Sequence, residues 1–182
     1  MSRRGVFLDL NGTLVLPAAP APLSEYRPIG NASQAVGYLC RAGFVCPVVT
    51  VQSGIAKGRF TETAFREWFE SFKRELAIRG AVVEGPYVCP HRYVEACACK
   101  KTGGELYRRA AADFGLTVGM SFVVGDTLED MEAAALLECP GVLVRTGSPV
   151  DSNVEVRATH VADDILAAAR WIVLQSRVTV TP

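Results

Sequence analysis

An excess of charge of either sign is absent from this 182-residue chain, because 19 lysines and arginines balance 19 aspartates and glutamates. Binding to nucleic acid or to an anionic membrane relies on a positively charged surface, so the balance argues against both kinds of partner. A small anionic substrate is not excluded, because it needs only a local positive site. We therefore expect a small-molecule substrate, no nucleic acid and no membrane.

Long apolar runs are absent as well. A membrane span needs roughly 20 apolar residues, and the apolar stretch 165–174 is interrupted by Arg170. The apolar run behind the basic start of the chain ends at Asp9, which is too short for a signal peptide. The chain also lacks internal repeats and linkers. The expectations are a cytoplasmic protein, one domain over residues 1–182 and a monomer.

Short β-favouring runs alternate with amphipathic segments along the chain. The pattern predicts strands over residues 6–8, 44–49, 81–88, 121–125 and 142–145, and helices over 31–41, 61–79, 104–114, 128–137 and 161–174. Asn31 is expected to cap the first helix, and Thr61 to open the second. The proline-rich segment 16–28 is expected to be a loop, and the tail from Gln175 has no assignment. The alternation predicts an α/β fold: a three-layer, Rossmann-like, doubly wound parallel sheet.

Polar residues gather just past the predicted strands or in the loops that open helices. The clusters are Asp9 with Asn11, Thr50 with Gln52 and Ser53, Lys100 with Lys101, and Asp126 with Glu129 and Asp130. Ligands of open α/β sheets bind outside the carboxyl ends of the strands. Phosphoryl transfer uses such a set: a carboxylate nucleophile, a cation held by carboxylates, and a hydroxyl and an ammonium on the phosphate oxygens. The alternative interpretation is that Asp9, Asp126 and Asp130 only cap turns or helix starts.

The six cysteines fall into two groups. Four potential ligands lie within eleven residues, namely Cys89, His91, Cys97 and Cys99. Sulfur and imidazole in a closed set of four suit a structural tetrahedral Zn²⁺, and the alternative is reduced thiols beside a surface histidine. The other cysteines, Cys40, Cys46 and Cys139, are interpreted as small core residues. His160 stands apart and is interpreted as a surface or helix-cap histidine.

Four segments together carry a family resemblance: residues 7–14, 48–58, 89–101 and 124–131. They resemble the motifs of the haloacid dehalogenase (HAD) superfamily of phosphatases, and most closely those of its heptose-bisphosphate and histidinol-phosphate phosphatase branch. The resemblance implies a minimal cap, with a zinc loop at 89–99 framing the substrate. It also implies an Mg²⁺-dependent hydrolysis of a small phosphorylated metabolite, of the sugar phosphate or bisphosphate type.

The resemblance assigns roles to particular residues. Asp9 corresponds to the nucleophile that forms an aspartyl-phosphate, and Thr50 and Lys101 to the groups that hold the phosphate. Mg²⁺ is expected on Asp9, Asp126 and the backbone carbonyl of Asn11. Asp130 is expected to contact these ligands and not the metal itself. The remaining expectations are Zn²⁺ on Cys89, His91, Cys97 and Cys99, and substrate contacts from Val51, Gln52, Ser53 and Lys100. Apart from the resemblance, Lys57 and Arg59 are interpreted as solvated charges, with contacts to a substrate phosphate as the alternative.

The chain departs from the family pattern around the same site. Asn11 stands where the family has an aspartate that protonates the leaving group and then activates water, and an amide cannot exchange a proton in this way. Val51 replaces an asparagine, Lys100 an arginine, and Thr102 and Gly104 two prolines. Two interpretations follow: a phosphatase with reduced turnover, or an impaired domain that binds a phosphorylated ligand or protein partner. A phosphatase acting on nucleic-acid ends is a weaker third, because the chain has no net charge.

Overall fold

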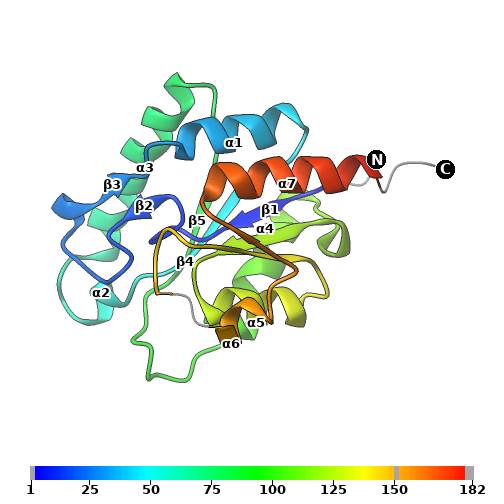
Figure 1. Cartoon of the computed structure of the whole chain (residues 1–182). Helices are drawn as coiled ribbons and strands as arrows, with labels where there is room; N and C mark the ends of the chain where they lie inside the picture. Colours follow the sequence, from blue (N-terminus) through cyan, green and yellow to red (C-terminus); the bar gives the residue numbers. More distant parts are fainter. Residues whose placement is uncertain (1–2, 150–151, 179–182) are drawn as a thin grey trace.

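A parallel six-stranded sheet forms the centre of the computed structural model, which describes residues 3–149 and 152–178 (Figure 1). The spatial order is β5-β4-β1-β6-β7-β8, and every neighbouring pair is parallel. The strands are β1 (Val6–Leu8), β4 (Pro47–Val51), β5 (Glu84–Cys89), β6 (Phe122–Gly125), β7 (Gly141–Val144) and β8 (His160–Ala162). The chain builds outward from β1 first to one side and then to the other, which places a ligand crevice at the carboxyl end of β1.

Helices cover both faces of the sheet. One face carries α1 (Ala32–Arg41), α3 (Glu62–Ile78) and α7 (Ile165–Val178), and the other carries α4 (Glu105–Phe114) and α5 (Leu128–Leu136) (Figure 1). Successive side chains of a strand point to opposite faces, so Val6 and Leu8 join the first core and Phe7 joins the second. The predicted doubly wound α/β fold is confirmed.

The start of α3 follows the sequence prediction closely. Thr61 is its N-cap, and its side-chain oxygen accepts a hydrogen bond from the backbone N–H of Ala64 at 3.1 Å. The apolar positions spaced by three and four residues are buried, namely Phe65, Phe69, Phe72 and Leu76. Asn31 occupies the predicted N-cap position of α1, but its side chain makes no capping hydrogen bond.

The predicted helix 161–174 was wrong at its start. Val161 lies in β8, which pairs with β7, and α7 begins only at Ile165. The Asp164 carboxylate accepts a hydrogen bond from the backbone N–H of Ala167 at 2.8 Å, as a residue just before a helix does. Only Asp163 and Asp164 separate the three-residue strand from the helix, so the sequence analysis joined the two into one helix.

Other boundaries differ less. Strand β5 begins at Glu84 and not at 81, because its partner β4 begins at Pro47, which pairs with Glu84. The predicted loop 16–28 contains a small antiparallel pair, β2 (Val15–Leu16) and β3 (Arg27–Pro28), and a 3₁₀ turn at Leu23–Glu25. Two four-residue helices, α2 (Ser53–Ala56) and α6 (Ser152–Glu155), were missed.

The carboxyl-terminal tail was left without an assignment, and α7 extends through it to Val178. The rest of that tail, 179–182, lies outside the described residues. Within the described part of the chain, no helix is both long and apolar enough to cross a membrane.

Candidate active site

Two aspartates emerge side by side at the carboxyl edge of the sheet. Strands β1 and β6 are neighbours, with Leu8 opposite Val124. Asp9 follows the first strand and Asp126 the second, and both side chains are buried. The backbone N–H of Asp9 donates to the carbonyl oxygen of Val124 at 2.9 Å, which continues the ladder to the aspartate itself. The parallel register thus brings together residues that are far apart in sequence.

Lys101 joins this pair from the segment that follows the cysteine loop. Its ammonium lies 2.6 Å from an Asp9 oxygen and 2.7 Å from an Asp130 oxygen, and the three side chains are almost completely buried. Asp130 also belongs to a capping box at the start of α5, in which its carboxylate accepts hydrogen bonds from the N–H and hydroxyl of Thr127. Both oxygens of Asp130 are therefore engaged, so it holds Lys101 in place.

Carboxylates outnumber ammonium groups in this buried cluster. Oxygens of Asp9, Asp126 and Asp130 lie within 4.8 Å of one another. Burial raises the pKa of Asp9 well above its ordinary value, and repulsion from the other two aspartates adds to this while Lys101 opposes it. Burial acts to lower the pKa of Lys101, but the carboxylates of Asp130 and Asp9 outweigh it and raise that pKa. Such an excess of negative charge suits a divalent cation.

Asp126 has one carboxylate oxygen held and one left over. Its Oδ2 accepts a hydrogen bond from the backbone N–H of Ser148 at 2.7 Å, whereas its buried Oδ1 has no hydrogen-bond partner among the described residues. Two glycines enclose this side chain: a Cβ added to Gly12 or Gly147 would lie 2.3 Å or 2.0 Å from Asp126 Oδ2. The unpartnered oxygen, together with Asp9, fits the two-carboxylate site that Mg²⁺ prefers.

A network of neutral side chains lies beside Asp9. The amide nitrogen of Gln52 donates to the side-chain oxygen of Asn11 at 2.8 Å and to the hydroxyl of Thr50 at 2.9 Å. The Gln52 oxygen accepts from the Tyr26 hydroxyl at 3.1 Å, and the Asn11 amide nitrogen donates to the carbonyl oxygen of Pro17 at 3.0 Å. Since the Thr50 oxygen already accepts a hydrogen bond, its hydroxyl proton is available for a ligand.

A cavity of about 710 Å³ opens above these groups. Among the predicted site residues, its lining includes Asp9, Asn11, Thr50, Val51, Lys100, Lys101 and Asp126. Gln52 and Ser53 do not line it: they are only 2% and 1% exposed, and they flank a smaller neighbouring pocket. The structure therefore places Gln52 behind Asn11 and Thr50, away from the cavity where a substrate contact was predicted.

Several lining residues were missed by the sequence analysis. Tyr93 comes from the cysteine loop, Glu132 from α5, and Gly147 and Ser148 from the segment after β7. Gly147 and Ser148 come just after a strand that the sequence predicts. The rule that ligands bind at the carboxyl ends of strands, which identified Asp9 and Asp126, would therefore have found them too. The sequence carries no comparable signal for Tyr93 or Glu132.

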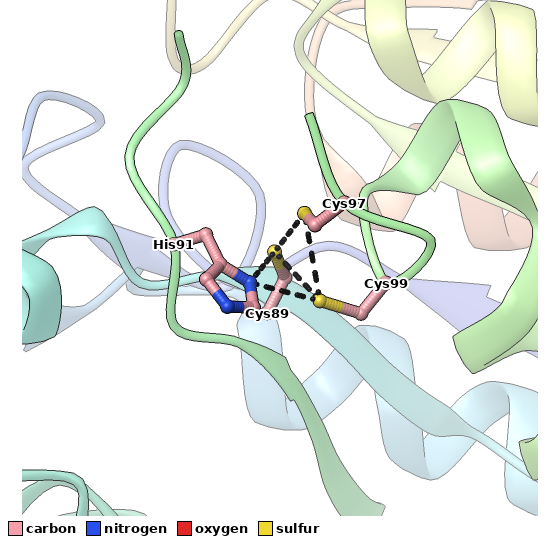
Figure 2. A group of neighbouring side chains, drawn as sticks. All are labelled: Cys89, His91, Cys97 and Cys99. Atoms are coloured by element: carbon pink, nitrogen blue, oxygen red, sulfur yellow. Dashed lines mark hydrogen bonds between the residues drawn. The ribbon is translucent and has the colours of Figure 1, made fainter. Parts of the chain in front are cut away.

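The four-residue Cys/His group assembles at one point, with its side chains turned toward one another (Figure 2). The sulfurs lie 3.6 Å (Cys89 to Cys97), 3.2 Å (Cys89 to Cys99) and 3.6 Å (Cys97 to Cys99) apart. His91 Nδ1 lies 3.7 Å from Cys89 Sγ and 3.2 Å from Cys99 Sγ. Zn–S bonds of about 2.3 Å at tetrahedral angles separate two sulfurs by about 3.8 Å, so a modest expansion of the group accommodates Zn²⁺.

This group anchors the loop that carries Lys101. Cys89 is the last residue of β5, and Cys99 is separated from Lys101 by one residue. Burial raises the pKa of the Cys89 thiol to about 12, so a metal binding there displaces a proton. Fixing both ends of the loop fixes the direction from which Lys101 enters the cavity.

The remaining candidates lie outside the cavity. Lys57 and Arg59 are exposed, and the Arg59 guanidinium donates to the carbonyl oxygen of Pro20. His160 starts β8 and stacks on Trp171 with ring centroids 4.5 Å apart.

The single cysteines are placed largely as expected. Cys46 and Cys139 are buried, and Cys40 is half-buried.

Comparisons with known proteins agree with this arrangement. A family model described as HAD-hydrolase-like matches residues 98–168. The chain is 34% identical over 169 residues to a D-glycero-β-D-manno-heptose-1,7-bisphosphate 7-phosphatase of Photorhabdus laumondii, with 88% of this chain and 90% of the relative covered. It is 33% identical over 187 residues to the Haemophilus ducreyi protein of that name, covering 94% of this chain and 100% of the relative.

A solved structure is similar over nearly the whole chain. It is the D,D-heptose 1,7-bisphosphate phosphatase from B. bronchiseptica complexed with magnesium and phosphate. Its TM-score is 0.80 at 27% identity, with 94% of this chain and 99% of that chain covered.

Proposed function

The chain belongs to the HAD-like phosphatases, and we propose that it is an Mg²⁺-dependent phosphomonoester hydrolase of small phosphorylated metabolites, with Asp9 as its nucleophile. The observation that carries the proposal is the position of Asp9 at the base of a 710 Å³ cavity, hydrogen-bonded to Lys101 at 2.6 Å. The relatives are named for a sugar bisphosphate, so sugar phosphates and bisphosphates are the first esters to test.

In the first step, the free oxygen of Asp9 forms a bond to phosphorus while the bond from phosphorus to the ester oxygen breaks. Lys101 holds the other Asp9 oxygen and adds positive charge beside the transferring group. Thr50 donates its hydroxyl proton to a phosphate oxygen, because its own oxygen is occupied by Gln52. A water then attacks the phosphorus of the aspartyl-phosphate, which releases inorganic phosphate and regenerates Asp9.

A bound Mg²⁺, held by Asp9, Asp126 and the backbone carbonyl of Asn11, would neutralise phosphate charge and orient the ester for in-line attack. The backbone N–H of Ser148 keeps Asp126 oriented with its unpartnered oxygen available. We also propose that Cys89, His91, Cys97 and Cys99 bind a structural Zn²⁺ that holds the Lys101 loop.

Asn11 makes proton transfer the weak part of this mechanism. Its amide can neither protonate the leaving oxygen nor accept a proton from water, and both ends of the amide are engaged, by Pro17 and by Gln52. A positioned acid–base group typically contributes about 10²–10⁴-fold to the rate. We therefore expect slow turnover of esters with poorly leaving alcohols, and faster turnover of p-nitrophenyl phosphate, whose leaving group needs no proton.

The test is phosphate release from a panel of phosphate esters with Mg²⁺, measured beside Asp9→Asn. The expected result is release by the wild-type protein and loss of release in the variant. EDTA should abolish release by the wild-type protein, and excess Mg²⁺ should restore it. Retained hydrolysis in a folded Asp9→Asn variant would contradict the nucleophile assignment.

A second candidate function follows from the engaged amide of Asn11: a domain that binds a phosphorylated ligand without useful turnover. It predicts no release from any ester, together with saturable binding of phosphate esters by the wild-type protein. Restoration of release by Asn11→Asp would then show that only the proton-transfer group is missing.

A further inference from the structure

Directional hydrogen bonds connect the segment that contains β2 and β3 with Thr50 in the cavity. The Asn11 amide nitrogen donates to the carbonyl oxygen of Pro17, and the Asn11 oxygen accepts from the Gln52 amide nitrogen. The same Gln52 nitrogen donates to the Thr50 hydroxyl, and the Gln52 oxygen accepts from the Tyr26 hydroxyl. Both amide groups are therefore hydrogen-bonded at both of their ends.

The carbonyl oxygen of Pro17 fixes the direction of these hydrogen bonds. A carbonyl oxygen can only accept, so Asn11 presents its nitrogen to Pro17 and its oxygen to Gln52. The Asn11 oxygen in turn requires the nitrogen end of the Gln52 amide. The Gln52 oxygen then faces Tyr26, whose hydroxyl acts as the donor.

The direction decides what Thr50 can offer a ligand. While Gln52 donates to the Thr50 oxygen, the Thr50 hydroxyl proton is available for a phosphate oxygen, as the proposed mechanism requires. If the Gln52 oxygen faced Thr50 instead, it would accept that proton. The two ends of an amide differ little in shape, so their hydrogen-bond partners decide between these arrangements.

Tyr26 supplies the partner of the Gln52 oxygen. Gln52 is buried, so its oxygen needs a donor within the protein. The Tyr26 hydroxyl lies 3.1 Å from it. The Tyr26 ring packs edge-on against Trp68 of α3, with ring centroids 5.2 Å apart, and this contact holds the hydroxyl in place. Without the hydroxyl, the Gln52 oxygen could regain a donor by turning toward Thr50, which lies 2.9 Å from the amide nitrogen.

We propose that Tyr26 is a positioning residue of the phosphate site: it occupies the Gln52 oxygen, so that Gln52 donates to Thr50 and the Thr50 proton remains available for the phosphate. Tyr26 is not part of the described lining of the cavity above Asp9, so it acts through Gln52 and not on the substrate. This inference rests on the proposed phosphatase function. It adds a residue from the segment 16–28, which the sequence analysis treated only as a loop.

The test is Tyr26→Phe, which keeps the ring against Trp68 and removes the hydroxyl alone. The Kd of inorganic phosphate, measured by calorimetry with Mg²⁺, should rise about three- to tenfold, as expected for the loss of one hydrogen bond. KM for p-nitrophenyl phosphate should rise by a similar factor while kcat changes by less than about twofold, because Thr50 holds the phosphate before and during its transfer.

The matched control is Tyr87→Phe. Tyr87 is also a buried tyrosine, and its hydroxyl donates to Asp113 at 2.7 Å, but it does not belong to the described lining of the cavity. This variant loses one tyrosine hydroxyl and one hydrogen bond, as Tyr26→Phe does, and should leave Kd and KM unchanged.

A double-mutant cycle separates the positioning role from a general loss of structure. In the Gln52→Leu background, Tyr26→Phe should change neither Kd nor KM by more than about 1.5-fold, because the residue through which it acts is gone. An unchanged Kd in the folded Tyr26→Phe protein, or an equal rise in both backgrounds, overturns this inference and leaves the phosphatase proposal standing.

The calorimetric measurement needs no turnover, so the two proposals can fail separately. A wild-type protein that binds phosphate but releases none from any ester contradicts the phosphatase proposal, and the Kd of Tyr26→Phe then still decides whether Tyr26 positions Thr50. A wild-type protein that neither binds nor releases phosphate contradicts both.

Discussion

Replacing Asn11 with aspartate tests the energetic argument about proton transfer most sharply. In the structure, the Asn11 oxygen accepts from Gln52 at 2.8 Å and its amide nitrogen donates to the Pro17 carbonyl at 3.0 Å. An aspartate at position 11 can still accept the hydrogen bond from Gln52. Its second oxygen, however, faces the carbonyl oxygen of Pro17, and both of these atoms are acceptors. The carboxyl group can donate to Pro17 only in its protonated form, so its pKa rises above the ordinary value of about 3.9.

The sign of the effect on stability follows from this shift. A carboxyl group with a raised pKa in the folded state contributes its stability below the pKa of the unfolded chain and loses it as pH rises through the folded pKa. Asn11→Asp is therefore expected to lower the free energy of unfolding more at pH 8 than at pH 4. The expected difference is about 1–3 kcal/mol, because at pH 8 the ionised carboxylate and the Pro17 carbonyl oxygen face each other without a proton between them. Urea unfolding at both pH values measures the difference.

The same variant should gain activity. Its carboxyl group can protonate the leaving oxygen and then accept a proton from water, so kcat for an alkyl phosphate should rise by about 10²–10⁴-fold. The gain should be smaller for p-nitrophenyl phosphate. Asp9→Asn combined with Asn11→Asp is the control, which keeps the stability change and shows no turnover. An unchanged rate in a folded Asn11→Asp protein would refute the reasoning that the missing acid limits catalysis.

Three other substitutions probe the supports of the site. Gly147→Ala places a methyl group against Asp126, and we expect at least a tenfold loss of phosphatase activity with weaker Mg²⁺ activation, measured by an Mg²⁺ titration. Cys97→Ser should reduce bound zinc from one per chain to below one and lower Tm; elemental analysis that finds no zinc in the wild-type protein would contradict the metal site. Gln52→Leu removes the donor that orients Thr50, and KM for phosphate esters should rise several-fold; unchanged kinetics would show that Gln52 does not orient it.

The sequence sufficed to predict the main architecture because periodicity and strand ends carry the information. Asp9 and Asp126 each follow a buried strand, and parallel strands bring their carboxyl ends to one edge, so their proximity could be predicted without coordinates. Thr61 could be assigned as a helix cap for a similar local reason: its hydroxyl needs only the backbone three residues later.

Features that depend on tertiary packing could not be read in this way. Gln52 follows a strand end exactly as a substrate-contacting residue would, yet Tyr26, Thr50 and Asn11 enclose it. Glu132 reaches the cavity because of how α5 is oriented on the sheet, which sequence spacing does not specify. The strand β8 is too short for its periodicity to separate it from the helix that follows.

The most direct test of the central claim is chemical trapping of the aspartyl-phosphate. The protein is mixed with p-nitrophenyl phosphate and Mg²⁺, quenched during turnover, reduced with borohydride and analysed by peptide mass spectrometry. Reduction of an aspartyl-phosphate gives homoserine, so the account predicts a loss of about 14 Da at Asp9. This product should accumulate more in the wild-type protein than in Asn11→Asp, because water attack lacks a base when residue 11 is asparagine. Phosphate release in which the peptide containing Asp9 stays unmodified, and which persists in Asp9→Asn, would contradict the account.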